Sequence, residues 1–243
     1  MTSITTHAVT DIGLKRSRNE DRYLVRATGE DSVLLAVADG MGGEAKGDVA
    51  AQTVIDVLND LADMGDVSED ILRQAVITAN NLLLRMVDKE PELEGMGTTA
   101  TIVLVKAMVA HFIHVGDSRL YLFRDGELQQ KTSDHAFLQT FLDDGTMTPE
   151  EASKHPFRNM LDQCVGCPSC APDSEEFAVL PGDILLLTSD GLHKELDDRQ
   201  MAQQLACNAS LQSRLEGLVA SALSAGGKDN VTAVAAEFPS ARA

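Results

Sequence analysis

Three apolar runs in this chain each end at an aspartate, and this pattern constrains the fold more than any other feature. Val-Leu-Leu-Ala-Val-Ala runs into Asp39, Phe-Ile-His-Val-Gly into Asp117, and Ile-Leu-Leu-Leu-Thr-Ser into Asp190. Short runs of this kind predict buried strands, so each strand would deliver one carboxylate at its tip. A single aspartate after a strand is most simply part of a turn, but three together favour a shared site.

Carboxylates that gather at one end of a fold repel one another and need positive charge among them. The nearby ligand candidates all carry oxygen, which predicts a hard cation such as Mg²⁺ or Mn²⁺ rather than zinc. Gly40 has no Cβ, so its carbonyl can approach an ion closely. Asp229 lies in a loop before the last predicted strand and can join the cluster. The alternative for Gly226–Asp229 is an ordinary loop that ends a helix.

Helices and strands do not alternate regularly along the chain. Helical spacing is clearest over Val49–Asp63, over Glu69–Val87 after an N-cap at Ser68, and over Leu211–Ala225 after Ser210. Apolar alternation and β-branched runs predict strands near Ile4–Gly13, Arg22–Ala27, Val33–Asp39, Thr98–Val105, Met108–Val115, Arg119–Arg124, Glu176–Leu180, Ile184–Ser189 and Thr232–Glu237. Helix pairs at both ends with hairpin-linked strands between them predict a layered α+β fold.

Two shorter signals add detail to this fold. Asp125-Gly126 predicts a two-residue hairpin turn, to which we assign no function. Thr148-Pro149-Glu150-Glu151 carries an N-cap, a proline at the first helical position and a glutamate at the third, which predicts a short helix running towards His155.

Length and charge exclude several classes of protein. The 243 residues fit one domain, which we expect to span 1–243. The formal net charge of −18 argues against nucleic acid as a partner, because binding a polyanion requires clustered Lys and Arg. No apolar run approaches the ~20 residues of a membrane span. Because Met1–His7 lacks the features of a secretory signal, we expect a cytoplasmic protein that does not bind membranes.

Six motifs follow one another in an order typical of one enzyme family. They are Thr10–Gly13 with Arg16 and Asn19–Asp21, Ala38–Gly43, Gly97–Thr99, Val115–Arg119, Thr188–Leu192 and Asp229–Thr232. In these motifs, over nearly its full length, the chain resembles the metal-dependent protein phosphatases of type 2C in their compact bacterial form. The resemblance implies a four-layer α/β/β/α sandwich, with two antiparallel sheets flanked by helix pairs and a dinuclear metal site at one end.

The resemblance also implies a set of metal ligands. Asp39 would bridge two tightly bound Mg²⁺ or Mn²⁺ ions. Asp190 and Asp229 would complete the protein ligands of the first ion, and the carbonyl of Gly40 would bind the second. Asp117, together with Asp190, would hold the third and weaker ion that is found in bacterial relatives.

Three further residues acquire roles in the same way. Glu20 and Asp21 match an acidic pair that binds metal or orients its waters. Arg16 matches the arginine that grips the substrate phosphate, a task that suits its planar fork. The alternative for Arg16 is a surface salt bridge that contributes little.

The implied reaction is hydrolysis of phosphoserine and phosphothreonine in proteins by a hydroxide that bridges the metals, with Arg16 and Asp39 as catalytic residues. The enzyme would reverse a bacterial Ser/Thr kinase, and a secretion-system regulator is one candidate substrate. We expect a monomer. One alternative is a catalytically weak phosphoprotein-binding regulatory domain. Another is a hydrolase of small phosphates or nucleotides, against which the absence of a G-x-x-x-x-G-K-[ST] loop argues.

Two features concern the proton donor and access to the site. Met41 stands where many eukaryotic relatives carry a histidine, so the group that protonates the leaving alkoxide is unassigned. A metal-bound water is the first candidate and His135 the second, although a lone histidine is more often a structural hydrogen-bonding group. The helix-rich segment Asp134–Asp173 stands in the position of the family's flap, and such loops usually decide substrate access.

Cysteines mark a departure from the family pattern. Cys164, Cys167 and Cys170 form C-x-x-C-x-x-C, and we expect Cys207 on an apolar helix face. We predict four reduced cysteines that bind no metal, because free cysteine is generally a small buried hydrophobe. A redox-sensitive disulfide and a zinc site are the alternatives.

Overall fold

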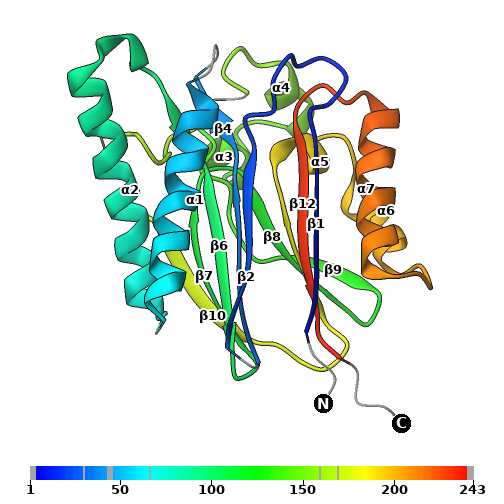
Figure 1. Ribbon diagram of the computed structural model, residues 1–243. Helices are drawn as coiled ribbons and strands as arrows, with labels where there is room; N and C mark the ends of the chain where they lie inside the picture. The colour runs from blue at the N-terminus through cyan, green and yellow to red at the C-terminus, as the bar shows by residue number, and fades with distance from the viewer. Residues whose placement is uncertain are drawn as a thin grey trace.

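Two antiparallel sheets pack face to face in the computed structural model, which describes residues 4–29, 31–42, 46–65, 67–158, 160–168 and 170–239 (Figure 1). One sheet has the order β1 (Thr5–Asp11), β12 (Val231–Glu237), β11 (Ile184–Thr188), β8 (Arg119–Arg124) and β9 (Glu127–Gln130). The other has the order β10 (Asp173–Ala178), β7 (Val109–Val115), β6 (Ala100–Lys106), β3 (Ser32–Ala38) and β2 (Arg22–Gly29). A small third sheet pairs β4 (Gly40–Met41) with β5 (Gly97–Thr98).

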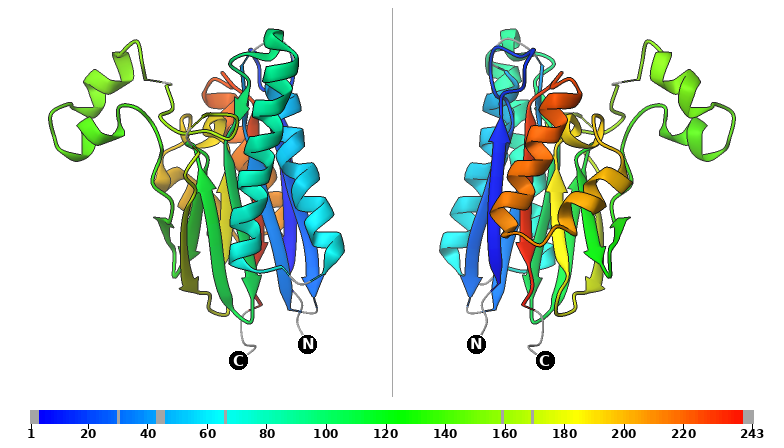
Figure 2. Two further views of the ribbon diagram at one scale, coloured as in Figure 1. Left: turned by 90° about the vertical axis from the view of Figure 1, so that its left-hand side faces the viewer. Right: turned by 90° about the vertical axis from the view of Figure 1, so that its right-hand side faces the viewer.

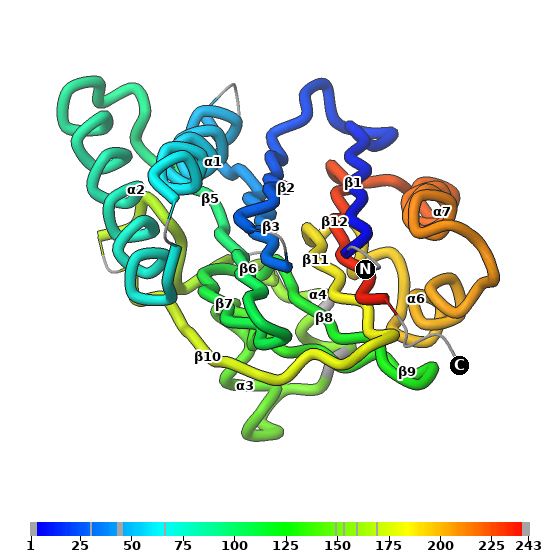
Figure 3. Tube along the Cα trace, turned by 60° about the horizontal axis from the view of Figure 1, so that its bottom comes forward, coloured from blue at the N-terminus to red at the C-terminus, as the bar shows by residue number. Residues whose placement is uncertain are grey.

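Helices cover the outer face of each large sheet. The β2–β10 sheet is covered by α1 (Gly47–Met64) and α2 (Glu69–Lys89), which the short 3₁₀ helix η1 (Pro91–Leu93) follows. The β1–β9 sheet is covered by α5 (Asp190–His193), α6 (Asp198–Leu205) and α7 (Leu211–Ala225). Figure 3 shows the helices on opposite sides of the paired sheets. The predicted four-layer sandwich is therefore confirmed.

Alternating side chains along each strand explain why the layers form. In β3, Leu34 and Ala36 face the helices α1 and α2, while Val33, Leu35 and Val37 face the other sheet. In β11, Leu186 faces the second helix layer and its neighbours face the sheet interface. Because side chains alternate between the two faces of a strand, each strand supplies two of the three apolar layers.

Most sequence predictions hold, with shifts at the ends of elements. Asp125-Gly126 forms the predicted turn between β8 and β9, with both residues at positive φ. Thr148 and Glu151 form the predicted capping box of α4 (Pro149–Lys154). Ser68 precedes α2 but makes no side-chain cap bond. The single strand predicted at Thr98–Val105 is divided into β5 and β6.

The flap, Asp134–Asp173, projects from the sandwich and carries two short helices (Figure 2). These are α3 (Gln139–Asp143) and α4. The chain returns to the body at Val165, which forms an antiparallel bridge with Thr98 of β5. No helix among the described residues has both the length and the apolar character needed to cross a bilayer.

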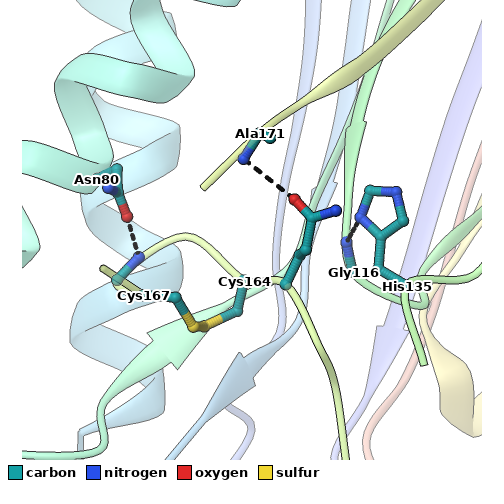
Figure 4. Close-up of a disulfide and its surroundings, with 8 residues drawn as sticks. Asn80, Gly116, His135, Cys164, Cys167 and Ala171 are labelled. Carbon is teal, nitrogen blue, oxygen red and sulfur yellow. Dashed lines mark hydrogen bonds between the residues drawn. A yellow bond between two sulfur atoms is a disulfide. The ribbon is translucent and has the colours of Figure 1, made fainter. Parts of the chain in front are cut away.

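The prediction of four reduced cysteines is wrong. Cys164 and Cys167 form a disulfide, whereas Cys170 and Cys207 are free (Figure 4). A turn, closed by the Cys167 N–H donating to the Cys164 carbonyl at 3.3 Å, brings the two Cα atoms within 5.4 Å. Cys207 is exposed just beyond α6 and not on an apolar helix face, because the helix already ends at Leu205.

Candidate active site

Loops at one end of the sandwich gather the predicted site residues around a single cavity. The strand β4 and the helix α5 mark this end in Figure 1. The cavity measures about 180 Å³ and is lined by Arg16, Glu20, Asp39, Gly40, Met41, Gly42, Thr99, Asp117, Leu161, Asp190, Lys194 and Asp229. The structure thus brings together every predicted site residue except Asp21, which lies buried beside the cavity. Gly43, the last residue of the second motif, lies outside the described residues.

Thr99 fixes the turn that carries Asp39. Its side-chain oxygen accepts the Asp39 N–H at 2.9 Å and bonds to Ser118 at 2.7 Å, and its own N–H donates to the Asp39 carbonyl. Partial burial, followed by the charges of Asp21 and Asp190, raises the pKa of Asp39 well above its usual range. Burial and neighbouring negative charge both disfavour the ionised form of a carboxylate.

Gly40 permits a close approach between two parts of the backbone. A Cβ at this position would lie 2.2 Å from the carbonyl oxygen of Gly47, at the start of α1, and 2.8 Å from that of Glu20. Real Cβ atoms essentially never come this close to another atom. The glycine is therefore required by packing, in addition to any role of its carbonyl in binding an ion.

Asn230 ties the Asp229 loop to the loop between β1 and β2. Its side-chain NH₂ donates to the carbonyls of Ile12 and Arg18, and its side-chain oxygen accepts the Glu20 N–H, each at 2.8 Å. Asp229 therefore lies beside Arg16 and Glu20 although they are far apart in sequence. Asn230 belonged to a recognised motif, but sequence reasoning gave it no role.

Asp21 is a buried carboxylate with one satisfied oxygen. Its Oδ2 accepts hydrogen bonds from Ser189 at 2.7 Å and Thr232 at 2.6 Å, while Oδ1 is buried with no hydrogen-bond partner among the described residues. Burial is the main reason that the pKa of Asp21 rises to about 7. An orphaned buried oxygen in this place fits a carboxylate that needs a bound water or ion beside it.

Two cations lie among these acids. The Arg16 guanidinium donates to Asp229 Oδ2 at 2.6 Å. Lys194 Nζ lies 2.6 Å from Asp190 Oδ2 and 3.1 Å from Asp117 Oδ2. Burial opposes the charged form of Lys194, but the carboxylates of Asp190 and Asp117 outweigh it and raise the pKa of this lysine. Sequence reasoning missed Lys194, although its spacing of four residues from Asp190 across a helical turn was visible.

The donor set fits hard divalent cations. The Asp39, Asp190 and Asp229 carboxylates and the Gly40 carbonyl offer only oxygen, which Mg²⁺ and Mn²⁺ prefer. The orphaned oxygen of Asp21, and the burial of Asp39 among other carboxylates, fit a site that takes a further cation. These residues could hold two ions.

His135 takes a structural place rather than a catalytic one. Its Nδ1 accepts the Gly116 N–H at 3.2 Å, and its Nε2 lies 3.1 Å from Asp173 Oδ2 (Figure 4). The ring packs against His114 with 4.9 Å between centroids. Because both ring nitrogens have partners and His135 is not among the residues that line the cavity, the structure favours the hydrogen-bonding interpretation of His135.

Comparisons with known proteins agree with this site. The family model for Protein phosphatase 2C matches residues 14–225. The serine/threonine protein phosphatase PstP of Mycobacterium tuberculosis is 42% identical over 232 residues, covering 92% of this chain and 45% of PstP. The chain thus spans about half the length of that relative. PhpP of Streptococcus pneumoniae is 33% identical, and the match covers 92% of this chain and 93% of PhpP.

A solved structure shows the same fold with metal present. The catalytic domain of PstP in complex with two manganese ions superposes with a TM-score of 0.85 at 40% identity, covering 96% of this chain and 97% of that one. The two manganese ions of that structure support divalent metal use in this fold. From the convergence of the aspartates on one cavity, the matched family model and these relatives, we conclude that the chain belongs to the protein phosphatase 2C family.

Proposed function

We propose that this chain hydrolyses phosphoserine and phosphothreonine in proteins with the help of two divalent metal ions. The observation that carries the proposal is the meeting of Asp39, Asp190 and Asp229 around one cavity that Arg16 also lines. Membership of the protein phosphatase 2C family and the two manganese ions of the PstP catalytic domain support it. The choice between Mg²⁺ and Mn²⁺ stays open.

Different residues of the cavity would bind the two ions. Asp39 would bridge both, Asp190 and Asp229 would hold the first, and the Gly40 carbonyl would bind the second. Glu20 and Asp21 would orient waters around them, which matches the unsatisfied oxygen of Asp21. When bound, such ions supply Lewis-acid stabilisation and lower the pKa of water from 15.7 towards about 7.

Arg16 would bind the substrate phosphate. Its side chain is 48% exposed and already meets an anionic oxygen of Asp229, so it is held at the cavity yet open to solvent. The loop beneath it is fixed by Asn230 and by the Leu14 N–H, which donates to the Gly227 carbonyl at 2.7 Å. A fixed guanidinium can give two parallel hydrogen bonds to phosphate oxygens and neutralise charge that develops on them.

The leaving alkoxide would take its proton from water. Met41 lines the cavity but has no proton to donate, and His135 lies elsewhere. An ammonium or guanidinium is a weak acid compared with a water beside divalent cations. The proposal therefore needs no protein side chain as the general acid.

A second cavity beside the site gives room for a protein substrate. It measures about 450 Å³ and shares Asp190, Lys194 and Asp229 with the first. Arg158 of the flap and Lys228 also line it. We propose that the chain is one phosphatase domain whose flap contributes to substrate access. The monomeric state, the cytoplasmic location, the opposing kinase and a secretion-system regulator as substrate stay predictions.

The test measures hydrolysis of para-nitrophenyl phosphate, a phosphothreonine peptide and a nucleotide by chelator-stripped protein, with and without Mn²⁺. We expect metal-dependent activity that prefers the peptide to the nucleotide and collapses in Asp39→Asn and Asp190→Asn. Asp56→Asn on the exposed side of α1 is the matched control and should behave as wild type. Metal binding without turnover in folded protein would favour a phosphoprotein-binding domain. Metal-independent turnover would refute the proposal.

A further inference from the structure

The carboxylates of Asp117 and Asp190 already share a cation in this structure. Lys194 Nζ lies 3.1 Å from Asp117 Oδ2 and 2.6 Å from Asp190 Oδ2, so one ammonium contacts both acids. Exposed fractions of 12% for the Asp117 side chain and 19% for that of Asp190 show that both acids are shielded from water. These two residues are the pair that family resemblance assigns to a third metal ion.

The backbone holds Lys194 in this position. The short helix α5 starts at Asp190, and the Lys194 N–H donates to the Asp190 carbonyl at 2.9 Å. Residues four apart on a helical turn lie on the same side, so the lysine side chain projects over the Asp190 carboxylate. Leu192, within this turn, is completely buried in the core and anchors it.

A lysine ammonium and a divalent ion compete for the same oxygens. Both would be held by the carboxylates of Asp117 and Asp190, whose Oδ2 atoms the ammonium already contacts, and like charges at such distances repel strongly in a partly buried site. An ammonium also satisfies part of what an ion would do, because its three N–H groups can donate to several acceptors. Among the residues that line the cavity, the only other cation is Arg16, which pairs with Asp229.

We infer that Lys194 takes the place of a third metal ion, so that this chain binds two ions and uses a built-in positive charge between Asp117 and Asp190. Lys194 is then a positioning residue, since its ammonium contacts Asp117 and Asp190 and holds Asp190 for the first ion. The inference rests on the proposed two-metal function and replaces the expectation of a third, weaker ion.

The test counts Mn²⁺ ions bound per chain by calorimetric titration of chelator-stripped protein, beside free Mn²⁺ measured by electron paramagnetic resonance. We expect two ions for wild type and two for Lys194→Arg, which keeps the charge. Lys194→Ala frees the carboxylate pair and should bind three. Lys194→Ala combined with Asp117→Asn should return to two, because the second change removes a ligand of the new site.

Each result separates this inference from the function on which it rests. Three ions in wild type, or only two in a folded Lys194→Ala protein, would overturn the role of Lys194 while leaving two-metal hydrolysis intact. Wild type that binds fewer than two ions and hydrolyses no phosphopeptide would overturn both. Thermal melting of each variant confirms that the counts come from folded protein.

Discussion

Replacing Gly191 by alanine tests how tightly the Asp190 and Asp229 loops must pack. A Cβ on Gly191 would lie 2.0 Å from the carbonyl oxygen of Asn230, whereas ordinary contact begins at 3.4 Å. The two backbones must therefore separate by about 1.4 Å to reach a normal van der Waals distance. Because Asp190 and Asp229 lie on either side of this contact, the change also moves two proposed ligands of one ion apart.

The size of the effect follows from what Asn230 holds. Its side chain makes three hydrogen bonds of 2.8 Å to the β1–β2 loop. Each is worth about 1 kcal/mol, and overpacking itself costs about 1–3 kcal/mol. Since the loops can relax in part, we expect a loss of roughly 2–4 kcal/mol. In a chain of this size that lowers the melting temperature by roughly 5–15 °C. Mn²⁺ affinity should fall at least about tenfold, equivalent to about 1.4 kcal/mol.

Gly217→Ala is the matched control, because it also adds one methyl group at a glycine. Its Cβ would meet only the amide end of the Gln204 side chain, which can rotate away. Alanine is favoured over glycine inside a helix by up to about 1 kcal/mol, so this variant should be neutral or slightly stabilised. Differential scanning calorimetry and Mn²⁺ titration measure both effects. A Gly191→Ala protein with wild-type melting temperature and Mn²⁺ affinity would refute the reasoning.

Three further changes probe other parts of the structure. Arg16→Lys should lower kcat/KM for a phosphopeptide by about 10–100-fold, because lysine cannot give two parallel hydrogen bonds to the phosphate. The melting temperature should change little, and unchanged kinetics would show that Arg16 does not bind the phosphate. Thr99→Val leaves the Asp39 N–H without its acceptor and should lower the free energy of unfolding, measured in urea, by about 1–3 kcal/mol. An unchanged urea midpoint would contradict this prediction. Burial, followed by the charge of His135, lowers the pKa of His114 to about 4. The unfolded chain therefore takes up a proton before the folded one, and stability should fall by up to about 1.4 kcal/mol per unit as pH drops from about 6.5 towards 4. In His114→Gln the free energy of unfolding should depend less on pH over this range. Equal slopes for wild type and the variant, both measured in chelator, would argue against this role of His114.

The layers were predictable because buried strands and long helices require apolar residues in a regular pattern along the sequence. The continuous apolar runs of β3 and β11 indicated both the strands and the aspartates that follow them. Short elements carried less signal. The capping box of α6, formed by Asp197 and Gln200, was present in the sequence but was not used. β5 is separate from β6 because it pairs with β4, and its Thr98 also bridges Val165 far along the chain; no local pattern indicates these pairings.

The side chains that line the cavity were predictable individually, but their protein partners were not. Aspartates after strands, supported by family motifs, pointed to the cavity residues. Lys194 was missed because the acids were considered only as metal ligands, so a protein cation among them was not sought. A redox-sensitive disulfide was one of the alternatives to four reduced cysteines, but the Cys164–Cys167 pairing depends on one local turn that the sequence did not indicate.

The bridge between Val165 and Thr98 limits how far the flap can move. The two residues exchange both backbone hydrogen bonds at 2.9 Å, and Thr98 in turn pairs with Gly40. The disulfide closes the chain immediately around Val165. Val165, within the flap, is thus joined through Thr98 to the backbone that presents the Gly40 carbonyl. A movement of the flap that keeps this bridge would bend the chain before Cys164 and leave the Gly40 backbone in place.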